Sequence, residues 1–253
     1  MRKQSGSSNA ALRYATNQLL VRVAAKSSKT QKMVFRDGTV LNYRRNLGDL
    51  QSIREIWLER HYRLPVWLKQ RKTLVDLGGN IGMTTLWLAK EYGFSEIVVV
   101  EPDATNASLL RTNLDTNGVG AKVFNAAIGP KDGEINFASS NCSNRGRISS
   151  EGVTVPMVSM PTVTEYFRGD AIDLVKLDIE GGEEFLVSSN CGWMDSINCV
   201  ITELHPEVID VRKVISAFAD RELVYHPGNA GVRKNELGNF MDMFVRAGVF
   251  DTT

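Results

Sequence analysis

Short apolar segments alternate with helical patterns from Thr73 onward, and this alternation restricts the fold more than any other feature. The apolar segments span 73–79, 96–103, 121–129, 171–182 and 198–206, and the helical patterns span 83–93, 106–118, 161–169, 183–189 and 207–221. Apolar strands without polar alternation are buried on both faces, as in parallel sheets that are covered by helices. The sequence therefore predicts an α/β domain with helices on both faces of a mostly parallel sheet.

The last two apolar segments break this alternation. Segments 222–227 and 240–247 are separated by a loop that has no helical pattern. A parallel return requires a long crossover, so strands joined only by a loop are usually antiparallel. We therefore expect the sheet to end with a reversed strand.

An N-terminal extension over residues 1–62 precedes the main domain, which we place at 63–253. Residues 11–25 carry apolar side chains at helical spacing, and a second helical pattern covers 48–62. The alternating segment 32–44 contains an Asp-Gly turn and is typical of a hairpin. The helix at 11–25 is expected to pack on the domain, or to form a lid or a homodimer contact.

Composition and charge exclude several classes of protein. The formal net charge of +1 gives no electrostatic reason to expect nucleic acid or an anionic membrane as partner. No segment reaches the roughly 18–20 apolar residues of a membrane helix, and Arg22 interrupts the apolar stretch that could resemble a signal peptide. Cys142, Cys191 and Cys199 form no C-x-x-C pair and fit free thiols in a reducing compartment. We expect a cytoplasmic protein.

A glycine-rich turn follows the first of the buried strands and opens a helix. It has the spacing Asp76-x-Gly78-x-Asn80-x-Gly82, which differs from the G-x-G-x-x-G of dinucleotide-binding proteins. Its glycines let the backbone turn sharply and approach a ligand closely. A carboxylate at Asp76 would repel a pyrophosphate but suits a ligand with an ammonium and a sulfonium.

The ends of the next two strands complete a nucleoside site. Glu101 ends the segment "IVVVE" and can accept both ribose hydroxyls, with Pro102 beside it. Asn125, Ala126 and Ala127 close the third strand, where they are expected to flank an adenine ring.

Five motifs in this order resemble the FkbM family of S-adenosylmethionine-dependent methyltransferases. They are "VDLGGNIGMTTLWLA", "VVVEPDATNASLLRTNL", "NAAIG", "LVKLDIEGGEEFLV" and "VITELHP". The resemblance covers about 73–206, extends loosely to 246 and leaves out 1–45. It implies a seven-stranded class I (Rossmann-like) fold with S-adenosylmethionine as cofactor. It also implies methyl transfer to a hydroxyl of a natural product or sugar.

The acceptor is expected beyond the carboxyl ends of the fourth and fifth strands, where open α/β sheets bind ligands. Asp178 and Glu203 end these strands, and Asp178 also adjoins the cofactor side. Lys176 projects to the same face as Asp178, because side chains alternate along a strand. An unpaired buried ammonium is costly, so we interpret Lys176 as a buried cation held by Asp178, Glu101 or Glu203.

Two catalytic roles remain open on this side. Asp178 and Glu203 could bind a divalent cation such as Mg²⁺ that lowers the pKa of the acceptor, although the nearby lysine opposes this. Alternatively, a side chain removes the proton: His205 first, because its ordinary pKa lies near neutrality, then Asp178, then Lys176. Glu180 is interpreted only as an acid in the first turn of a helix.

Several alternatives remain beside this hypothesis. The polar loop 139–152 is either a surface loop or a cover for the acceptor that offers Arg145 or Arg147. A methyltransferase of a macromolecule is disfavoured because "DIEG" stands where base-modifying enzymes carry a D/N-P-P-Y/F turn. A dinucleotide-binding oxidoreductase conflicts with the glycine spacing. A cofactor-binding partner without turnover is the fourth candidate.

Overall fold

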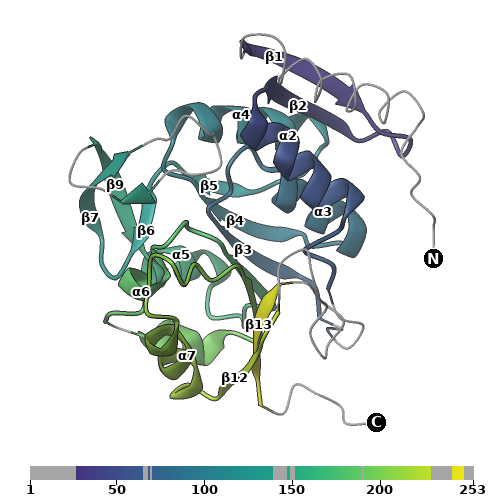
Figure 1. Ribbon diagram of the computed structural model, residues 1–253. Coiled ribbons are helices and arrows are strands. Elements are labelled where there is room, and N and C mark those ends of the chain that lie inside the picture. The colour runs from purple at the N-terminus through teal and green to yellow at the C-terminus, as the bar shows by residue number, and fades with distance from the viewer. Residues whose placement is uncertain are drawn as a thin grey trace.

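The computed structural model describes residues 27–64, 68, 70–138, 147–148, 152–189, 191–228 and 241–247. A seven-stranded sheet in the order β12-β13-β11-β10-β3-β4-β5 lies at its centre (Figure 1). The strands are β3 (Thr73–Leu77), β4 (Glu96–Val100), β5 (Lys122–Phe124), β10 (Leu174–Leu177), β11 (Cys199–Thr202), β12 (Leu223–His226) and β13 (Asp242–Arg246). Strand β13 is antiparallel to both neighbours, and the other neighbouring pairs are parallel. The predicted α/β fold with one reversed strand is confirmed.

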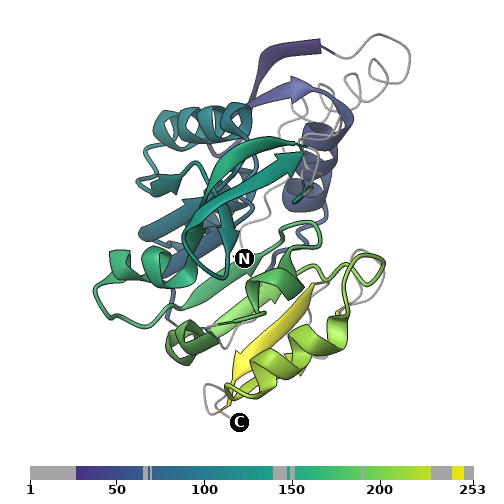
Figure 2. The ribbon, with the colours of Figure 1, turned by 90° about the vertical axis from the view of Figure 1, so that its left-hand side faces the viewer.

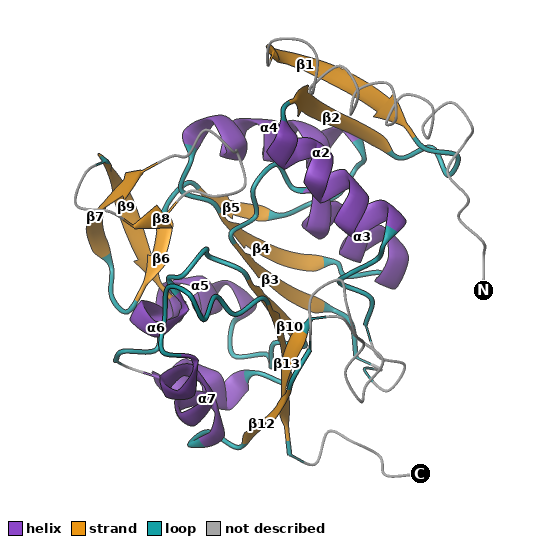
Figure 3. Ribbon diagram, in the orientation of Figure 1, coloured by secondary structure: helices purple, strands orange, loops and turns teal. Residues whose placement is uncertain are grey.

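Helices cover both faces of this sheet (Figure 3). One buried apolar cluster contains side chains of α2 (Leu47–Ile53), α3 (Met83–Tyr92) and α4 (Ala104–Thr116). The cluster on the other face contains side chains of α5 (Met160–Thr164), α6 (Glu183–Leu186) and α7 (Val211–Ala219). Burial on both sides explains why the strands read as continuous apolar segments.

Alternation along the strands decides which polar side chains enter the core. Leu74 belongs to the α3 cluster, whereas Val75 and Leu77 belong to the other. Asp76 therefore points to the α3 face, and Lys176 points to the same face from β10. Both side chains are almost completely buried.

The predicted hairpin is present as β1 (Ser27–Val34) and β2 (Val40–Arg45). It lies beside α2 and α4 in both views (Figures 1 and 2). Backbone groups of β2 hydrogen-bond the side chains of Asn113 and Asn117 in and after α4. The hairpin shares its buried cluster with α3 and α4, so this part of the extension packs against the main domain. The helical pattern at 48–62 is shorter than predicted, because α2 ends in a π-helical turn over Arg54–Leu58.

The predicted single strand at 121–129 is wrong. Its first half is β5 of the main sheet, and its second half, β6 (Ala127–Gly129), pairs with β9 (Val153–Ser159). A second sheet in the order β6-β9-β7-β8 also includes β7 (Gly133–Ala138) and β8 (Arg147–Ile148). Asn125 lies at the break, where its amide donates to the carbonyls of Glu101 and Pro102. This non-local pairing cannot be seen in the local pattern of apolar residues.

Some predictions lie outside the described residues. They are the helix at 11–25 and most of the loop at 139–152, including Arg145. Within the described part of the chain, each helix is too short or too polar to cross a lipid bilayer.

Candidate active site

A cavity of about 750 Å³ opens at the carboxyl ends of β3, β4, β10 and β11. The glycine turn after β3 and Glu101 line this cavity together with Asp178, Glu203 and His205. The motifs at the ends of separate strands therefore surround one space, as the parallel sheet requires.

The glycine turn is shaped by contacts that only glycine allows. Gly78 has a φ of 79°, and a Cβ atom there would lie 2.0 Å from the carbonyl oxygen of Asp178. Gly82 has a φ of 80° and begins α3. Gly78 and Asn80 line the cavity, whereas Gly82 lies behind it. The turn thus brings the chain close to β10 and leaves room for a ligand.

Asp76 is placed differently from its predicted contact with the cofactor. Its carboxylate is fully buried and is not part of the cavity lining. Oδ2 accepts a hydrogen bond from Thr85 at 2.5 Å, and Oδ1 lies 3.2 Å from Nζ of Lys176. Asp76 therefore holds Lys176 in place.

Lys176 is a buried cation, as the sequence predicts. Its main partner is Asp76, which was not among the expected partners. Nζ also donates to the carbonyls of Leu77 at 3.1 Å and Gly78 at 2.6 Å, and lies 3.7 Å from Asp178. Burial lowers the pKa of Lys176, but Asp76 and Asp178 outweigh it and raise this pKa above the ordinary value. A lysine that keeps its proton so firmly cannot act as a base.

Glu101 lines the cavity and is hydrogen-bonded to the glycine turn. Oε2 accepts the backbone N–H of Asn80 at 2.7 Å, and Oε1 accepts that of Asp103 at 2.9 Å. Burial raises the pKa of Glu101 to about 7 against the opposing effect of these hydrogen bonds. The carboxylate lines the cavity and is only 5% exposed.

Only some of the residues predicted to flank the adenine line the cavity. Pro102 and Ala127 line the cavity, together with Ile128 and Phe137 of the second sheet. Asn125 and Ala126 are absent from this lining. Asn125 instead fixes the loop after β4 through its two hydrogen bonds to carbonyl groups.

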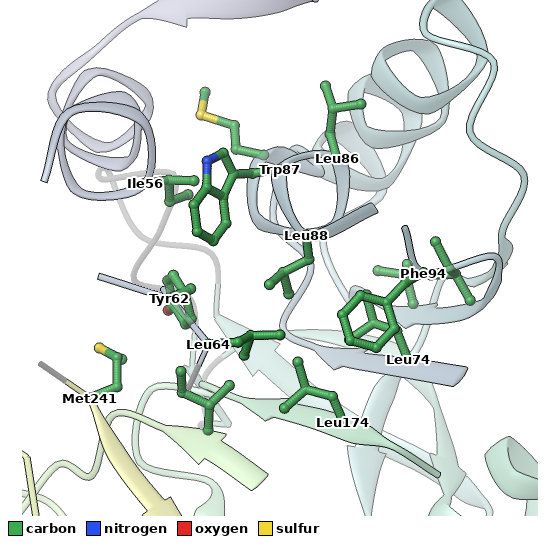
Figure 4. Packing of buried hydrophobic residues seen from close by; sticks show 14 of the residues in the cluster. Ile56, Tyr62, Leu64, Leu74, Leu86, Trp87, Leu88, Phe94, Leu174 and Met241 are labelled. Atoms are coloured by element: carbon green, nitrogen blue, oxygen red, sulfur yellow. The ribbon is translucent and has the colours of Figure 1, made fainter. Parts of the chain in front are cut away.

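Tyr62 belongs to the site and was not found from the sequence. Its hydroxyl donates to Oδ2 of Asp178 at 3.0 Å across 116 residues of chain. Its ring lies within the apolar cluster with Ile56, Leu64 and Met241 (Figure 4). Burial, followed by the charges of Asp178 and Glu203, raises the pKa of Tyr62 well above its ordinary value. The sequence offers only a weak signal for Tyr62, because many tyrosines in protein cores likewise have an apolar ring and a hydroxyl group that needs a partner.

His205 is held by acids on two sides. Nδ1 lies 3.3 Å from Oε1 of Glu183, and Nε2 lies 3.7 Å from Oε2 of Glu180. Burial lowers the pKa of His205, but Glu183, Asp178 and Glu180 outweigh burial and raise this pKa to about 9. The ring is therefore protonated at neutral pH, which argues against the predicted role as a base.

Glu180 has a larger part in the site than the sequence suggested. Helix α6 begins only at Glu183, so Glu180 lies in the turn before it. Its φ of 55° is unusual for a residue with a side chain, and it lines the cavity. The helix dipole therefore does not explain this residue.

Glu203 lies after β11 and lines the cavity together with Asp178. Glu203 is an exposed residue, but desolvation of its carboxyl group by the surrounding protein, followed by the charge of Asp178, raises its pKa to about 7. The predicted metal pair of Asp178 and Glu203 thus shares one cavity. Among the described residues, the group of three ligand-type side chains that lie close enough to share an ion is Asp178, Glu180 and His205.

The order of the strands, the single reversed strand and the position of the cavity define a class I methyltransferase fold. A sequence model of the methyltransferase FkbM domain matches residues 76–226, more than half of the chain. The chain therefore belongs to the FkbM family of S-adenosylmethionine-dependent methyltransferases.

Two characterised relatives are similar to this chain over different lengths. Hexuronic acid methyltransferase AglP of Haloferax volcanii is 26% identical over 180 residues, 66% of this chain and 74% of AglP. Methyltransferase 1 of Beauveria bassiana is 29% identical over 83 residues, 32% of this chain and 33% of that protein.

Solved methyltransferase structures give further matches. FkbM methyltransferase from Methylobacillus flagellatus KT has a TM-score of 0.47 and 14% identity, covering 78% of this chain and 53% of that chain. A methyltransferase from Pyrococcus furiosus has a TM-score of 0.48 and 14% identity, covering 94% of this chain and 98% of that chain. The chain thus spans about half the length of the Methylobacillus protein.

Proposed function

We propose that the chain transfers a methyl group from S-adenosylmethionine to a hydroxyl of a small molecule, a sugar or another natural product. The observation that carries this proposal is the single cavity between the glycine turn with Glu101 and the acids Asp178 and Glu203. A cofactor held by the glycine turn and Glu101 would place its methyl group toward an acceptor held by Asp178 and Glu203. In-line placement of oxygen, methyl and sulfur supplies much of the rate in such a reaction.

The described residues fit this cofactor. Gly78 and Asn80 line the cavity, and buried Oδ1 of Asn80 has no hydrogen-bond partner within the described structure. The carboxylate of Glu101 faces the same space and suits two adjacent hydroxyls. The bound cofactor would supply an electrophilic methyl group on a sulfonium.

Asp178 and Glu203 would receive and orient the acceptor. Both line the cavity at the tips of neighbouring strands, β10 and β11. Tyr62 and Lys176 hold Asp178 at Oδ2. A hydroxyl that attacks the methyl group must lose its proton, and a cavity carboxylate can accept it.

A sugar acceptor is the class that we favour. The name of AglP states that it methylates a hexuronic acid. The cavity here carries many hydrogen-bonding side chains, including acids, histidines and Gln51, which suit a compound rich in hydroxyls. A dinucleotide oxidoreductase remains opposed by the turn spacing, and the neutral net charge gives no support to a nucleic-acid substrate.

Two measurements test the proposal. Calorimetry should show S-adenosylmethionine and S-adenosylhomocysteine binding at micromolar levels and no binding of NAD. The purified chain should then form S-adenosylhomocysteine and a methyl ether when it is given S-adenosylmethionine with neutral sugars or uronic acid glycosides. Tight NAD binding, or cofactor binding without turnover on any hydroxylated acceptor, would contradict the proposal.

A further inference from the structure

Three metal-ligating side chains meet at the acceptor end of the cavity. One ligand atom from each of Asp178, Glu180 and His205 lies within 4.8 Å of the others. They come from separate places: the end of β10, the left-handed turn after it and the segment after β11. A separation of this size allows one ion to contact all three groups after small side-chain rotations.

Glu183 is a second observation that points to a ligand. Its carboxylate is fully buried, and Oε1 faces Nδ1 of His205 at 3.3 Å while it also accepts the N–H of Ile179. A carboxylate at Nδ1 holds hydrogen on that nitrogen, so Nε2 is the nitrogen that would give up its proton when a metal binds. Nε2 faces Glu180. Metal-binding histidines are commonly oriented by a carboxylate in this way.

The contacts of Asp178 leave one oxygen available. The hydroxyl of Tyr62 and the ammonium of Lys176 both approach Oδ2, so neither of these contacts uses Oδ1. Lys176 would repel a cation, but its charge is opposed by Asp76 at 3.2 Å and by two carbonyl groups. The lysine therefore orients Asp178 and does not prevent a metal from binding to the cluster.

We propose that Asp178, Glu180 and His205 bind a divalent cation, with Glu183 as the residue that orients His205. Two carboxylates and one imidazole suit a metal such as Mn²⁺ better than Mg²⁺, which prefers oxygen ligands alone. Three protein ligands leave open coordination positions that face the cavity. An acceptor with two adjacent oxygens could fill them, and the metal would lower the pKa of the bound hydroxyl. This last role rests on the proposed function, whereas the binding of the metal does not.

Mn²⁺ binding tests the site directly. The full chain is freed of metal by chelation, and the six-line electron paramagnetic resonance signal of free Mn²⁺ is followed during a titration. One saturable site per chain is expected. Glu180→Gln, His205→Gln and Asp178→Asn should each weaken it, and Glu183→Gln should weaken it about 10- to 100-fold by its effect on His205.

Two variants serve as matched controls. Glu207→Gln removes another acid of the cavity that lies outside the cluster, and it should change the affinity by less than about twofold, since its charge is screened by water. Glu203→Gln distinguishes this site from the Asp178–Glu203 pair expected from the sequence. A large loss for Glu203→Gln with none for Glu180→Gln would overturn the proposal. Circular dichroism melting curves identify any variant that fails to fold.

The outcome separates this inference from the proposed function. Saturable Mn²⁺ binding that depends on Glu180 and Glu183 supports the metal site even if no acceptor is methylated. Equal, weak binding by the parent chain and the Glu180→Gln variant would show that the cluster is only an ion-pair network around His205. If the site also acts in catalysis, chelation should abolish turnover, and added Mn²⁺ should restore it.

Discussion

Lys176 and Asp76 are register partners on the neighbouring strands β10 and β3, with Nζ and Oδ1 3.2 Å apart. Both side chains are buried. The ammonium also donates to the carbonyls of Leu77 and Gly78. One buried ion pair thus joins the central strands and supports the glycine turn at the cavity.

Breaking this pair should destabilise the protein strongly. Lys176→Met leaves Asp76 as a buried charge without its counter-ion, which costs about 3–5 kcal/mol. Urea denaturation measures the loss in free energy of unfolding. Lys72→Met is the matched control, because Lys72 forms its ion pairs with Glu96 and Asp170 at the surface, where water screens them. Equal stability of the two variants would contradict the importance of the buried pair.

Gly78 should not tolerate a side chain. In Gly78→Ala the new Cβ atom would meet the carbonyl oxygen of Asp178 at 2.0 Å, so strain and displacement together should cost about 3 kcal/mol. Gly93→Ala has a similar φ of 83° with no neighbour within 4 Å and should lose only about 1 kcal/mol. Denaturation curves compare the two, and similar losses would show that the close approach to β10 does not matter.

Removing the carboxylate of Glu101 should weaken cofactor binding. If Glu101 binds the ribose as proposed, Glu101→Ala removes charge-assisted hydrogen bonds that are each worth about 1.5–3 kcal/mol, so affinity for S-adenosylhomocysteine should fall at least about tenfold. Calorimetry measures this affinity. Asp115→Ala removes an exposed acid of α4 outside the cavity lining and should bind like the parent chain. An unchanged affinity in Glu101→Ala would refute the ribose assignment.

Cofactor affinity should also depend on pH through Glu101. Its pKa of about 7 in the free chain means that the group is mostly protonated at pH 6. Binding two hydroxyls favours the ionised form, so affinity should rise with pH by up to about tenfold per unit below pH 7 and level off above it. Calorimetry between pH 5.5 and 8.5 follows this change. Glu101→Gln should lose the dependence, and a similar slope in both proteins would assign it to another group.

Tyr62→Phe should impair turnover more than cofactor binding. The substitution removes the hydroxyl that holds Oδ2 of Asp178, and a loss of about 1.4 kcal/mol in orientation corresponds to a tenfold lower kcat. Tyr225→Phe removes a comparable bond to Asp242 in β13 and should leave kcat near that of the parent chain. Steady-state kinetics gives kcat and KM for both. If kcat of Tyr62→Phe equals that of the parent chain, the Tyr62 hydroxyl does not contribute to turnover.

The residues at the ends of the strands could be predicted from the sequence. The residues with which the charged side chains form ion pairs and hydrogen bonds could not. Gly78 and Glu101 line the cavity, and each could be picked out in the sequence because it follows an apolar run that is recognisable on its own. The sequence predicted that Asp76 contacts the cofactor. Its contact with Lys176 could not be predicted, because that contact depends on the pairing of strands about 100 residues apart. Tyr62 was missed because 116 residues separate it from Asp178.

The succession of continuous apolar segments and helical patterns is enough to determine the order along the chain of the strands and helices of the central sheet, and the residues at the ends of those strands. It does so because burial on both faces of a parallel sheet imposes a pattern on neighbouring residues. Tertiary structure decided the rest: that 121–129 divides between two sheets, that Asp76 neutralises Lys176, and that Glu180 and His205 meet Asp178. These contacts join segments far apart in the chain, and their geometry exists only once the sheet has formed.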